Sequence, residues 1–438
     1  MRLAITFPNH WAIKNILHSG VAAHLQDHCE IVGLAHHSRI PHLVDLVEQL
    51  GLRPIEWVPY APPPEHPKLT RLRRLQKGFV FERQNVATER IMRERGKRSR
   101  AEMIASALIK PIAQSSRSEL VEKWLMRRRW NLTAGAEIPE VEVLFTTNPV
   151  DFREDPLVKS AREAGIRVVT MIPSWDNLSS KGVLFCEFDA VFVWNEVMQR
   201  EVREFLPNLS ERQVPIVGIP RFGIYEDQRS PRPPKRRILF ANTATKSFPD
   251  QPAVAQHLAE ALQAGAFGDA ELLVRCHPHD NPSDYDFLRT FPEVLVWPES
   301  ADAFGVDTVP PSDDLVNLRD MLQASDVCVN CASTIVLDAA ANDVPIISVA
   351  YDGDRKLSHH ESVARFYEYT HQRPFLKSQA AELVSSRADL IKAVQDALAH
   401  PLAKREQRAT LARLATVGQP QFRLAKALLQ EQEARRVA

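Results

Sequence analysis

Several features are absent from this sequence. No apolar run approaches the about 20 residues that a membrane-spanning helix needs. The opening stretch, MRLAITFPNH, is too short in its apolar part for a secretory signal and is better interpreted as a first buried strand. The five cysteines are odd in number and widely spaced, so they do not make a disulfide framework and they favour a reducing cytoplasm. There is no short-period repeat and no low-complexity tract.

What the chain does contain is typical of a folded globular protein. Its 438 residues are 44% apolar and 25% charged, which excludes wholesale disorder, and the length predicts two domains. The 55 basic and 55 acidic residues cancel, but the segment from His66 to Trp130 holds 18 Lys and Arg against 6 Asp and Glu. That local charge of +12 bears on the partners of the protein rather than on its fold.

Short apolar runs alternate with helical patterns along most of the chain, which is typical of parallel sheets buried on both faces. In the first half we expect strands at Arg2–Phe7, Glu30–Ala35, Pro54–Pro59, Val141–Thr147, Arg167–Pro173, Phe188–Asn195 and Val214–Pro220. In the second half the runs RRILFAN, AELLVRCHP, EVLVWP, VCVNC and VPIISVA have the same character. We therefore predict an α/β protein of two Rossmann-like, doubly wound domains whose ligand loops face a cleft.

The polar, proline-rich stretch from Glu226 to Arg237 is the best domain boundary. It separates an N-terminal domain, residues 1–225, from a C-terminal domain, residues 236–400, which a charged helix over residues 401–438 follows. The basic segment, residues 66–130, interrupts the N-terminal domain as a helical insert. Its role stays open between a docking face for anionic lipid, a site for an acidic polysaccharide and an ordinary solvated face. No recognition motif for nucleic acid accompanies it.

Polar residues follow three predicted strands of the second half, where such domains bind ligands. After VCVNC, a helix start at Ser333 and Thr334 suits a phosphate, and Asp338 one turn later suits a ribose diol. Simple N-capping is the alternative for the two hydroxyls. The loop after RRILFAN lacks the glycine-rich phosphate patterns and offers hydroxyls and an amine instead, at Thr243, Thr245 and Lys246.

The segment RCHPHD supplies Arg275, His277 and His279 at the end of another strand. These side chains suit phosphate oxygens or proton donation, and an exposed turn is the alternative. Two histidines at i and i+2 with no further ligand cluster give no metal site. The pair Cys328 and Cys331 forms a C-x-x-C along a predicted strand, which argues against a redox role.

The first half offers two loops for proton transfer. In SWDNLSSKG, Asp176 could take a proton from an acceptor hydroxyl, and Asn177, Lys181 and the backbone of Gly182 could contact a diphosphate. An Asx-type turn that satisfies only the local backbone is the alternative. His10 follows the first strand and would face the same cleft, although a single histidine is more often structural.

The set SWDNLSSKG, FDAVFVWN, VGIPRFGIY, RCHPHD and the block ASDVCV with its later ST, D and PII resembles bacterial surface-polysaccharide glycosyltransferases of the GT-B fold. It is similar, more distantly, to CDP-glycerol glycerophosphotransferases and UDP-GlcNAc 2-epimerases. The resemblance covers roughly Val141 to Lys404, and the basic insert has no counterpart in it.

The resemblance implies that the C-terminal domain binds a nucleotide-sugar donor. Ser333 and Thr334 would hold its phosphates, Asp338 its ribose, and Arg275 and His277 would lie beside the phosphates. The N-terminal domain would bind the acceptor and supply the base, Asp176 or else His10.

Many retaining relatives carry two glutamates eight positions apart, but this chain has Asn330 and Asp338 there. The resemblance therefore favours an inverting transfer with no metal and no other cofactor.

The predicted function is glycosyl transfer to a lipid-linked or polysaccharide acceptor in cell-surface glycan synthesis, in the cytoplasm or peripherally at the inner membrane. A nucleotide-sugar 2-epimerase of the same fold and a non-catalytic scaffold for polysaccharide assembly remain as alternatives. Polar residues at several separate strand ends, which packing alone does not require, favour catalysis.

Overall fold

A computed structural model describes residues 2–95, 109–226, 233–278, 280–298, 308–415 and 418–437. The chain divides into two compact units. Unit 1 comprises Met1–Gly223, Val309–Ser312 and Val417–Ala438, and unit 2 comprises Ile224–Thr308 and Asp313–Thr416. Within the described ranges no helix is both long enough and apolar enough to cross a membrane.

Unit 1 contains a six-stranded parallel sheet in the order β3-β2-β1-β4-β5-β6. Its central strands are almost entirely buried, which explains why they read as continuous apolar runs rather than as alternating patterns. The strands are β1 (Arg2–Thr6), β2 (Glu30–Ala35), β3 (Glu56–Pro59), β4 (Val143–Thr146), β5 (Arg167–Met171) and β6 (Ala190–Phe192).

Helices connect these strands as crossovers. They are α1 (His10–Ile13), which continues as a π-helical turn at Lys14–His18, α2 (Val21–Gln26), α3 (Ile40–Gln49) and α8 (Asp155–Glu163). Helix α9 (Glu196–Phe205) follows the last strand of the sheet, β6. Short 3-10 turns lie at His37–Arg39, Phe152–Glu154, Glu211–Gln213 and Pro220–Glu226, and a second π-helical turn, Asn177–Lys181, follows β5.

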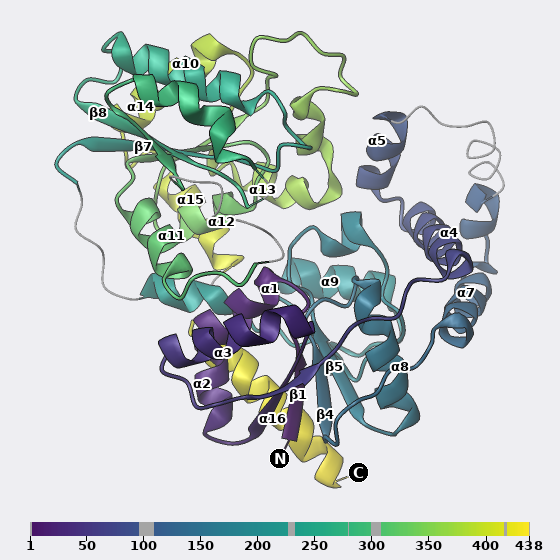
Figure 1. Ribbon diagram of the computed structural model, residues 1–438. Coiled ribbons are helices and arrows are strands. Elements are labelled where there is room, and N and C mark those ends of the chain that lie inside the picture. The colour runs from purple at the N-terminus through teal and green to yellow at the C-terminus, as the bar shows by residue number, and fades with distance from the viewer. Residues whose placement is uncertain are drawn as a thin grey trace. The chain divides into compact units, whose positions relative to one another are not determined.

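The predicted basic segment forms helices α4 (Pro67–Arg83), α5 (Ala87–Arg95) and α7 (Ser118–Leu132) in its described parts. Helices α4 and α7 pack side by side, beyond α8 as seen from the sheet (Figure 1). A small apolar cluster joins these helices to the body of unit 1 through Val183 and Phe205. Ion pairs neutralise part of the positive charge: Arg73 with Glu65, Arg83 with Glu122, Arg93 with Glu89 and Arg129 with Asp155.

The C-terminal helix α16 (Pro420–Val437) belongs to unit 1, although it follows the whole of unit 2 in the sequence. It packs against α2, with Leu424 and Leu428 completely buried in the core of unit 1 (Figure 1, yellow). Arg167 of β5 forms an ion pair with Glu431 of the helix. The last described residues therefore complete the first unit.

Unit 2 repeats the architecture with a parallel sheet in the order β12-β11-β10-β7-β8-β9. The strands are β7 (Arg236–Ala241), β8 (Ala270–Arg275), β9 (Val294–Trp297), β10 (Val327–Asn330), β11 (Ile346–Val349) and β12 (Ala381–Val384). The helices are α10 (Gln251–Gln263), α11 (Asp314–Gln323), α12 (Ile335–Ala341), α13 (Arg373–Ser378), α14 (Arg387–Ala399) and α15 (Arg405–Arg413), with 3-10 turns at Pro282–Thr290, Val363–Glu368 and Thr370–Gln372.

The prediction of two Rossmann-like α/β units is confirmed. Two details of the strand prediction were wrong. Val214–Pro220 is not a strand and makes only a single bridge, from Ile216 to Val193, because the segment holds two prolines, which lack the N–H that a ladder needs. Strand β12 was missed, because two of its four side chains, Glu382 and Leu383, are exposed at the edge of the sheet and give no apolar run. The expected C-terminal helical stretch is divided between α15 of unit 2 and α16 of unit 1.

Candidate active-site loops

The topology brings the predicted loops of each unit to one edge of its sheet. Because all strands in each sheet are parallel, every loop that follows a strand leaves at the same, carboxyl edge. The chain reverses its direction of sheet growth between β1 and β4 in unit 1, and between β7 and β10 in unit 2. Ligands of doubly wound sheets bind outside such reversal points. The loops after these four strands are therefore the first places to search.

In unit 2, the end residues of four neighbouring strands lie in register across this edge. Asn330 of β10 pairs with Ala241 of β7, Ala241 with Arg275 of β8, and Arg275 with Trp297 of β9. In-register side chains of parallel strands project from the same face of the sheet. The register therefore places the predicted phosphate ligand Arg275 one strand away from the reversal point.

Arg275 is a buried cation. Its side chain is only 9% exposed, and its guanidinium lies 5.2 Å from the centre of the Trp297 ring. Its buried Nε makes no hydrogen bond, and no carboxylate among the described residues forms an ion pair with it. Arginine is almost never buried without a partner, because the charge loses its hydration. The site therefore has the character of a receptor for an anion.

Asp280 connects the loop after β8 to the loop after β7. Its Oδ2 accepts hydrogen bonds from Asn242 Nδ2 at 3.0 Å, from Gln251 Nε2 at 3.2 Å and from the Tyr285 hydroxyl at 3.1 Å. Its Oδ1 accepts a hydrogen bond from the hydroxyl of the predicted residue Thr245. The carboxylate thus holds the two loops together, a role that sequence reasoning missed.

The other predicted residues of these two loops have different surroundings. The backbone N–H and carbonyl of Thr243 pair with the side chain of Gln251, at 3.0 and 2.8 Å. Lys246 is exposed at the surface of its loop, and His277 is half-buried. His279 lies outside the described residues.

The loop after β10 leads into α12 through a left-handed residue, Ala332, at φ +44°. The Tyr367 hydroxyl accepts a hydrogen bond from the backbone N–H of Ala332, and Gln372 donates to its carbonyl, each at 3.0 Å. Ser333 Oγ accepts a hydrogen bond from the N–H of Ile335 at 3.3 Å, so Ser333 does perform the local capping that the sequence left open. The hydroxyl of Thr334 makes no such capping bond.

Asp338 is 2% exposed, and its Oδ1 accepts a hydrogen bond of 2.6 Å from the hydroxyl of Tyr225. Tyr225 belongs to the same unit and was not singled out from the sequence. Cys328 reports on both charges: burial raises the pKa of its thiol to about 12, with the Asp338 charge raising it further and the Arg275 charge lowering it. The elevated pKa makes Cys328 a poor nucleophile.

In unit 1, Asp176 lies at the start of the π-helical turn after β5. Its Oδ1 accepts a hydrogen bond from Ser174 Oγ at 2.6 Å, and its Oδ2 accepts one from Ser180 Oγ at 2.9 Å. Lys181 Nζ lies 3.2 Å from the same Oδ2. These contacts are with side chains, and they compete with an acceptor hydroxyl for the carboxylate. Asn177, the next residue, is buried.

The helices of the basic segment contact this loop. Lys77 Nζ of α4 donates a hydrogen bond of 2.8 Å to the carbonyl of Ser180, and α5 packs against the Asn177–Lys181 turn. Burial lowers the pKa of Lys77, and the nearby Lys181 lowers it further, against the raising effect of Glu89. The insert thus fixes the position of the loop that carries Asp176.

His10 is 6% exposed and begins α1, where Asn9 Oδ1 accepts hydrogen bonds from the N–H groups of Trp11 and Ala12. At the reversal point between β1 and β4 lies a carboxyl that sequence reasoning missed. Glu154, 2% exposed, accepts hydrogen bonds from the Thr6 hydroxyl and from the N–H groups of Thr147 and Asn148. Burial raises the pKa of Glu154 to about 8 despite these donors.

Glu154→Gln should make the protein less sensitive to alkaline pH. Because the folded-state pKa of about 8 lies above the ordinary value of 4.5, the folded state holds an extra proton between these values, and stability falls as the pH rises through about 8. The amide removes this slope, so the stability of the variant relative to the wild type should rise by about 1–3 kcal/mol between pH 6 and pH 9. Urea unfolding of both proteins at pH 6 and pH 9 measures this rise. An equal change in unfolding free energy from pH 6 to pH 9 in the two proteins would contradict the prediction.

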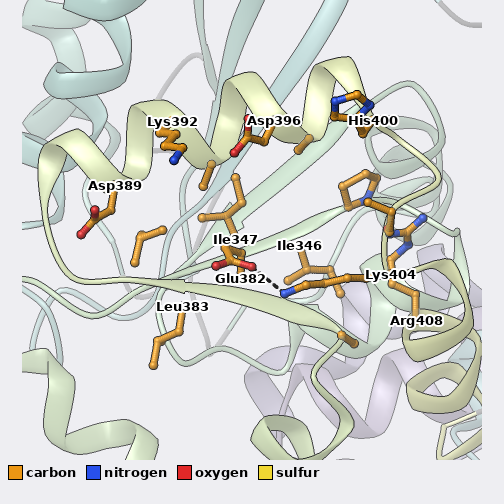
Figure 2. A pocket seen from close by; sticks show the side chains of 16 residues that line it. Ile346, Ile347, Glu382, Leu383, Asp389, Lys392, Asp396, His400, Lys404 and Arg408 are labelled. Atoms are coloured by element: carbon orange, nitrogen blue, oxygen red, sulfur yellow. Dashed lines mark hydrogen bonds and ion pairs between the residues drawn. The ribbon is translucent and has the colours of Figure 1, made fainter.

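One cavity of about 670 Å³ lies in unit 2 between α14 and the edge strand β12 (Figure 2). Apolar side chains such as Ile346, Ile347 and Leu383 line it together with charged groups, among them the ion pair of Lys404 and Glu382. None of the predicted site residues lines this cavity. Within the described parts of the chain, no three His, Cys, Asp or Glu side chains gather as metal ligands would.

Comparison with known proteins finds no matching family model and no matching curated protein. Solved structures do match along their whole length. A putative UDP-N-acetylglucosamine 2-epimerase from Listeria monocytogenes has a TM-score of 0.58 at 12% identity, covering 99% of this chain and 97% of its own. The UDP-GlcNAc 2-epimerase from Neisseria meningitidis, solved with UDP-GlcNAc bound, has a TM-score of 0.55 at 10% identity, covering 98% and 100%.

The glycotransferase of kitacinnamycin has a TM-score of 0.52 at 12% identity, covering 98% of each chain. Both epimerases and a glycosyltransferase are thus among the similar structures. At these identities the likeness is one of fold, and the chain has the two-unit GT-B type of architecture that these enzymes share.

Proposed function

We propose that the protein is a glycosyltransferase that uses a nucleotide sugar, with the donor bound by unit 2. The observation that carries this proposal is Arg275, a buried guanidinium at the carboxyl edge of a doubly wound sheet that forms no ion pair with any described carboxylate. A diphosphate supplies the missing negative charge and accepts charge-assisted hydrogen bonds from it. Nucleotide sugars are also the ligands of structurally similar enzymes, such as the Neisseria epimerase solved with UDP-GlcNAc.

The remaining donor contacts follow from the loops of unit 2. His277 and Lys246 would approach the diphosphate, and the hydroxyls of Thr243, Thr245, Ser333 and Thr334 and the imidazole of His279 complete the proposed donor set. Asp338 would bind the ribose through its carboxylate, which also accepts a hydrogen bond from the Tyr225 hydroxyl. No metal ion or other cofactor is part of the proposal, since a guanidinium can stabilise a leaving diphosphate without one.

The proposed reaction is a single displacement. A base removes the proton of an acceptor hydroxyl while its oxygen attacks the anomeric carbon, and the bond from that carbon to the diphosphate breaks. The diphosphate leaves with the bonding electrons, and the product has inverted configuration. Asp176 is the first candidate for the base and His10 the second, with Asn177 and Lys181 beside the acceptor or the diphosphate. The acceptor would be a lipid-linked or polysaccharide glycan of the cell surface.

A 2-epimerase is the second candidate, and the similarity to structures of that activity favours it. The two activities differ in one bond. Epimerisation at carbon 2 breaks and remakes the bond from that carbon to hydrogen, whereas glycosyl transfer leaves it intact. Incubation of the protein with UDP-GlcNAc in deuterium oxide without any acceptor separates them, because only an epimerase introduces deuterium at carbon 2. Deuterium incorporation would replace our proposal by the second candidate.

Nucleotide binding itself is tested by thermal unfolding with UDP, CDP, GDP, CMP, TDP and ADP, each with Mg²⁺ and with EDTA. A ligand that binds only the folded protein should raise the melting temperature by about 5 °C at about 100 times its dissociation constant. We expect one nucleoside diphosphate to act, in EDTA as in Mg²⁺. The absence of any shift would contradict the donor site and leave the scaffold as the best remaining function.

A further inference from the structure

Helix α7 presents two large apolar side chains to solvent. Leu120 is 67% exposed and Trp124 is 53% exposed. They are four residues apart and therefore lie on the same face of the helix, one turn apart. The opposite face is buried, with Leu125 at 1% exposure in the apolar cluster that joins the insert to unit 1. The exposed pair is thus a surface feature of a helix whose orientation is fixed by packing.

Cations flank this apolar pair on the same outer face. Lys123, Arg127 and Arg128 are all exposed, and the Arg128 guanidinium lies 5.5 Å from the centre of the Trp124 ring. None of the three forms an ion pair with a described residue. The acidic residues of α7 are Glu119, in the first turn, and Glu122, which is buried and paired with Arg83.

The inner and outer faces of the insert therefore differ in the state of their charges. On the inner face, Arg129 pairs with Asp155 and Arg83 pairs with Glu122, so the basic groups there hold the fold together. On the outer face of α7 the basic groups have no such structural use. Three of the exposed cations that remain, Lys123, Arg127 and Arg128, lie around Leu120 and Trp124.

We infer that the outer face of α7 docks on a bilayer surface that contains anionic lipid. Cations attract the headgroups, and a leucine and a tryptophan between them can enter the region where headgroups meet acyl chains. A soluble polyanion would bind the cations but would leave Leu120 in water. It would therefore account for the charged residues of this face and not for the apolar ones. The exposed apolar pair decides in favour of the bilayer.

This inference goes beyond the proposed reaction and does not depend on it, because vesicle binding is measured without any substrate. It also connects the outer face with the contacts that the same helical segment makes on its inner side. Lys77 holds the carbonyl of Ser180 in the loop of Asp176. A bilayer that binds the outer face would hold this loop at a fixed distance from the lipid surface.

The test is co-sedimentation of the full-length protein with vesicles, at low ionic strength. We expect binding to mixed phosphatidylglycerol and phosphatidylcholine vesicles and little binding to phosphatidylcholine alone. The triple variant Lys123→Gln, Arg127→Gln, Arg128→Gln should bind the mixed vesicles about 100-fold more weakly, since each cation near the surface contributes roughly a five-fold factor. The double variant Leu120→Ser, Trp124→Ser should lose at least about ten-fold.

Matched controls are available in unit 2. Leu402 has the same exposure as Leu120, 67%, so Leu402→Ser should bind vesicles like the wild type. The triple variant Lys356→Gln, Lys377→Gln, Lys392→Gln removes three exposed cations elsewhere and should lose much less than the α7 triple variant. Binding that falls equally in both triple variants would overturn the inference in favour of a general charge effect.

Two further results would also overturn the inference. One is no binding of the wild type to the mixed vesicles. The other is a double variant, Leu120→Ser, Trp124→Ser, that binds both immobilised dextran sulfate and the mixed vesicles as well as the wild type does. The second result would identify an acidic polysaccharide as the partner of this face.

Discussion

Replacing Arg275 by methionine should weaken nucleoside diphosphate binding about 100-fold or more and leave the ligand-free protein as stable as the wild type, or more stable. The side chain is 9% exposed and has no carboxylate partner among the described residues. Replacing a buried charge by an apolar side chain of similar length is often neutral or stabilising, by up to a few kcal/mol. Loss of the contact with the Trp297 ring offsets about 1 kcal/mol of that gain.

The binding loss should be large because the guanidinium would contribute two charge-assisted hydrogen bonds to the diphosphate. At roughly 1.5 kcal/mol each, their removal weakens binding about 100-fold or more. Isothermal titration with the nucleotide that raises the melting temperature of the wild type measures this loss. Urea unfolding without ligand measures the stability, which should stay at the wild-type value or rise while binding is weakened.

Arg237→Met is the matched control for Arg275→Met. Arg237 lies at the opposite, amino edge of the same sheet and forms an ion pair with Glu271, with which it is in register. Its loss should cost stability, about 1 kcal/mol, and should leave nucleotide binding unchanged. If Arg275→Met instead destabilised the ligand-free protein by several kcal/mol and bound nucleotide like the wild type, Arg275 would be a structural residue and the donor site would be elsewhere.

The fold could be predicted from the sequence because buried parallel strands leave a strong local signal. Each predicted run from RRILFAN to VPIISVA became a strand of unit 2, and apart from the edge strand β9 these strands are largely buried. Strand β12 could not be predicted in this way, because half of its side chains are exposed at the edge of the sheet and it contains no apolar run. The location of α16 in unit 1 has no local signal, because it depends on contacts with α2, almost 400 residues earlier in the sequence.

The candidate site was predictable only at the level of loops. Polar residues after apolar runs identified the carboxyl edges, but not the environment of each side chain. The sequence FREDP looks like an ordinary charged turn, and Glu154 is buried only because Thr6, 148 positions earlier, ends a neighbouring strand. In the same way, the burial of Arg275 against Trp297, away from any described carboxylate, is a property of the folded sheet. The role of Asp176 as a base stays a prediction.

Replacing Arg129 by methionine should destabilise the protein by about 3–5 kcal/mol, because the change leaves the buried carboxylate of Asp155 without its partner. Arg129 is 2% exposed, and its Nη2 lies 2.7 Å from Asp155 Oδ2. Its Nη1 also donates to Gln76 Oε1 at 3.3 Å and to the carbonyl of Val183 at 3.2 Å. One side chain therefore joins α4, α7, α8 and the segment that follows the Asp176 loop.

The loss should depend on pH in a definite direction. Burial raises the pKa of Asp155 to about 6, while the Arg129 charge acts to lower it, so removal of Arg129 raises the folded-state pKa further. A raised folded-state pKa makes stability fall as the pH rises through it, because the folded state must give up a proton that it holds more tightly. The difference in unfolding free energy between wild type and variant should thus be largest above about pH 7 and should shrink toward pH 5.

The exposed pair of Arg203 and Glu211, with side chains 46% and 72% exposed, provides the control. Arg203→Met should change stability by less than about 0.5 kcal/mol, with little dependence on pH, because water screens the pair. Amide hydrogen exchange of residues 180–184 adds a local readout and should accelerate in Arg129→Met alone. A variant that keeps wild-type stability at pH 8 would show that the apolar cluster holds the insert without the ion pair. The support of the Asp176 loop would then have to come from the Lys77 contact and the packing of α5.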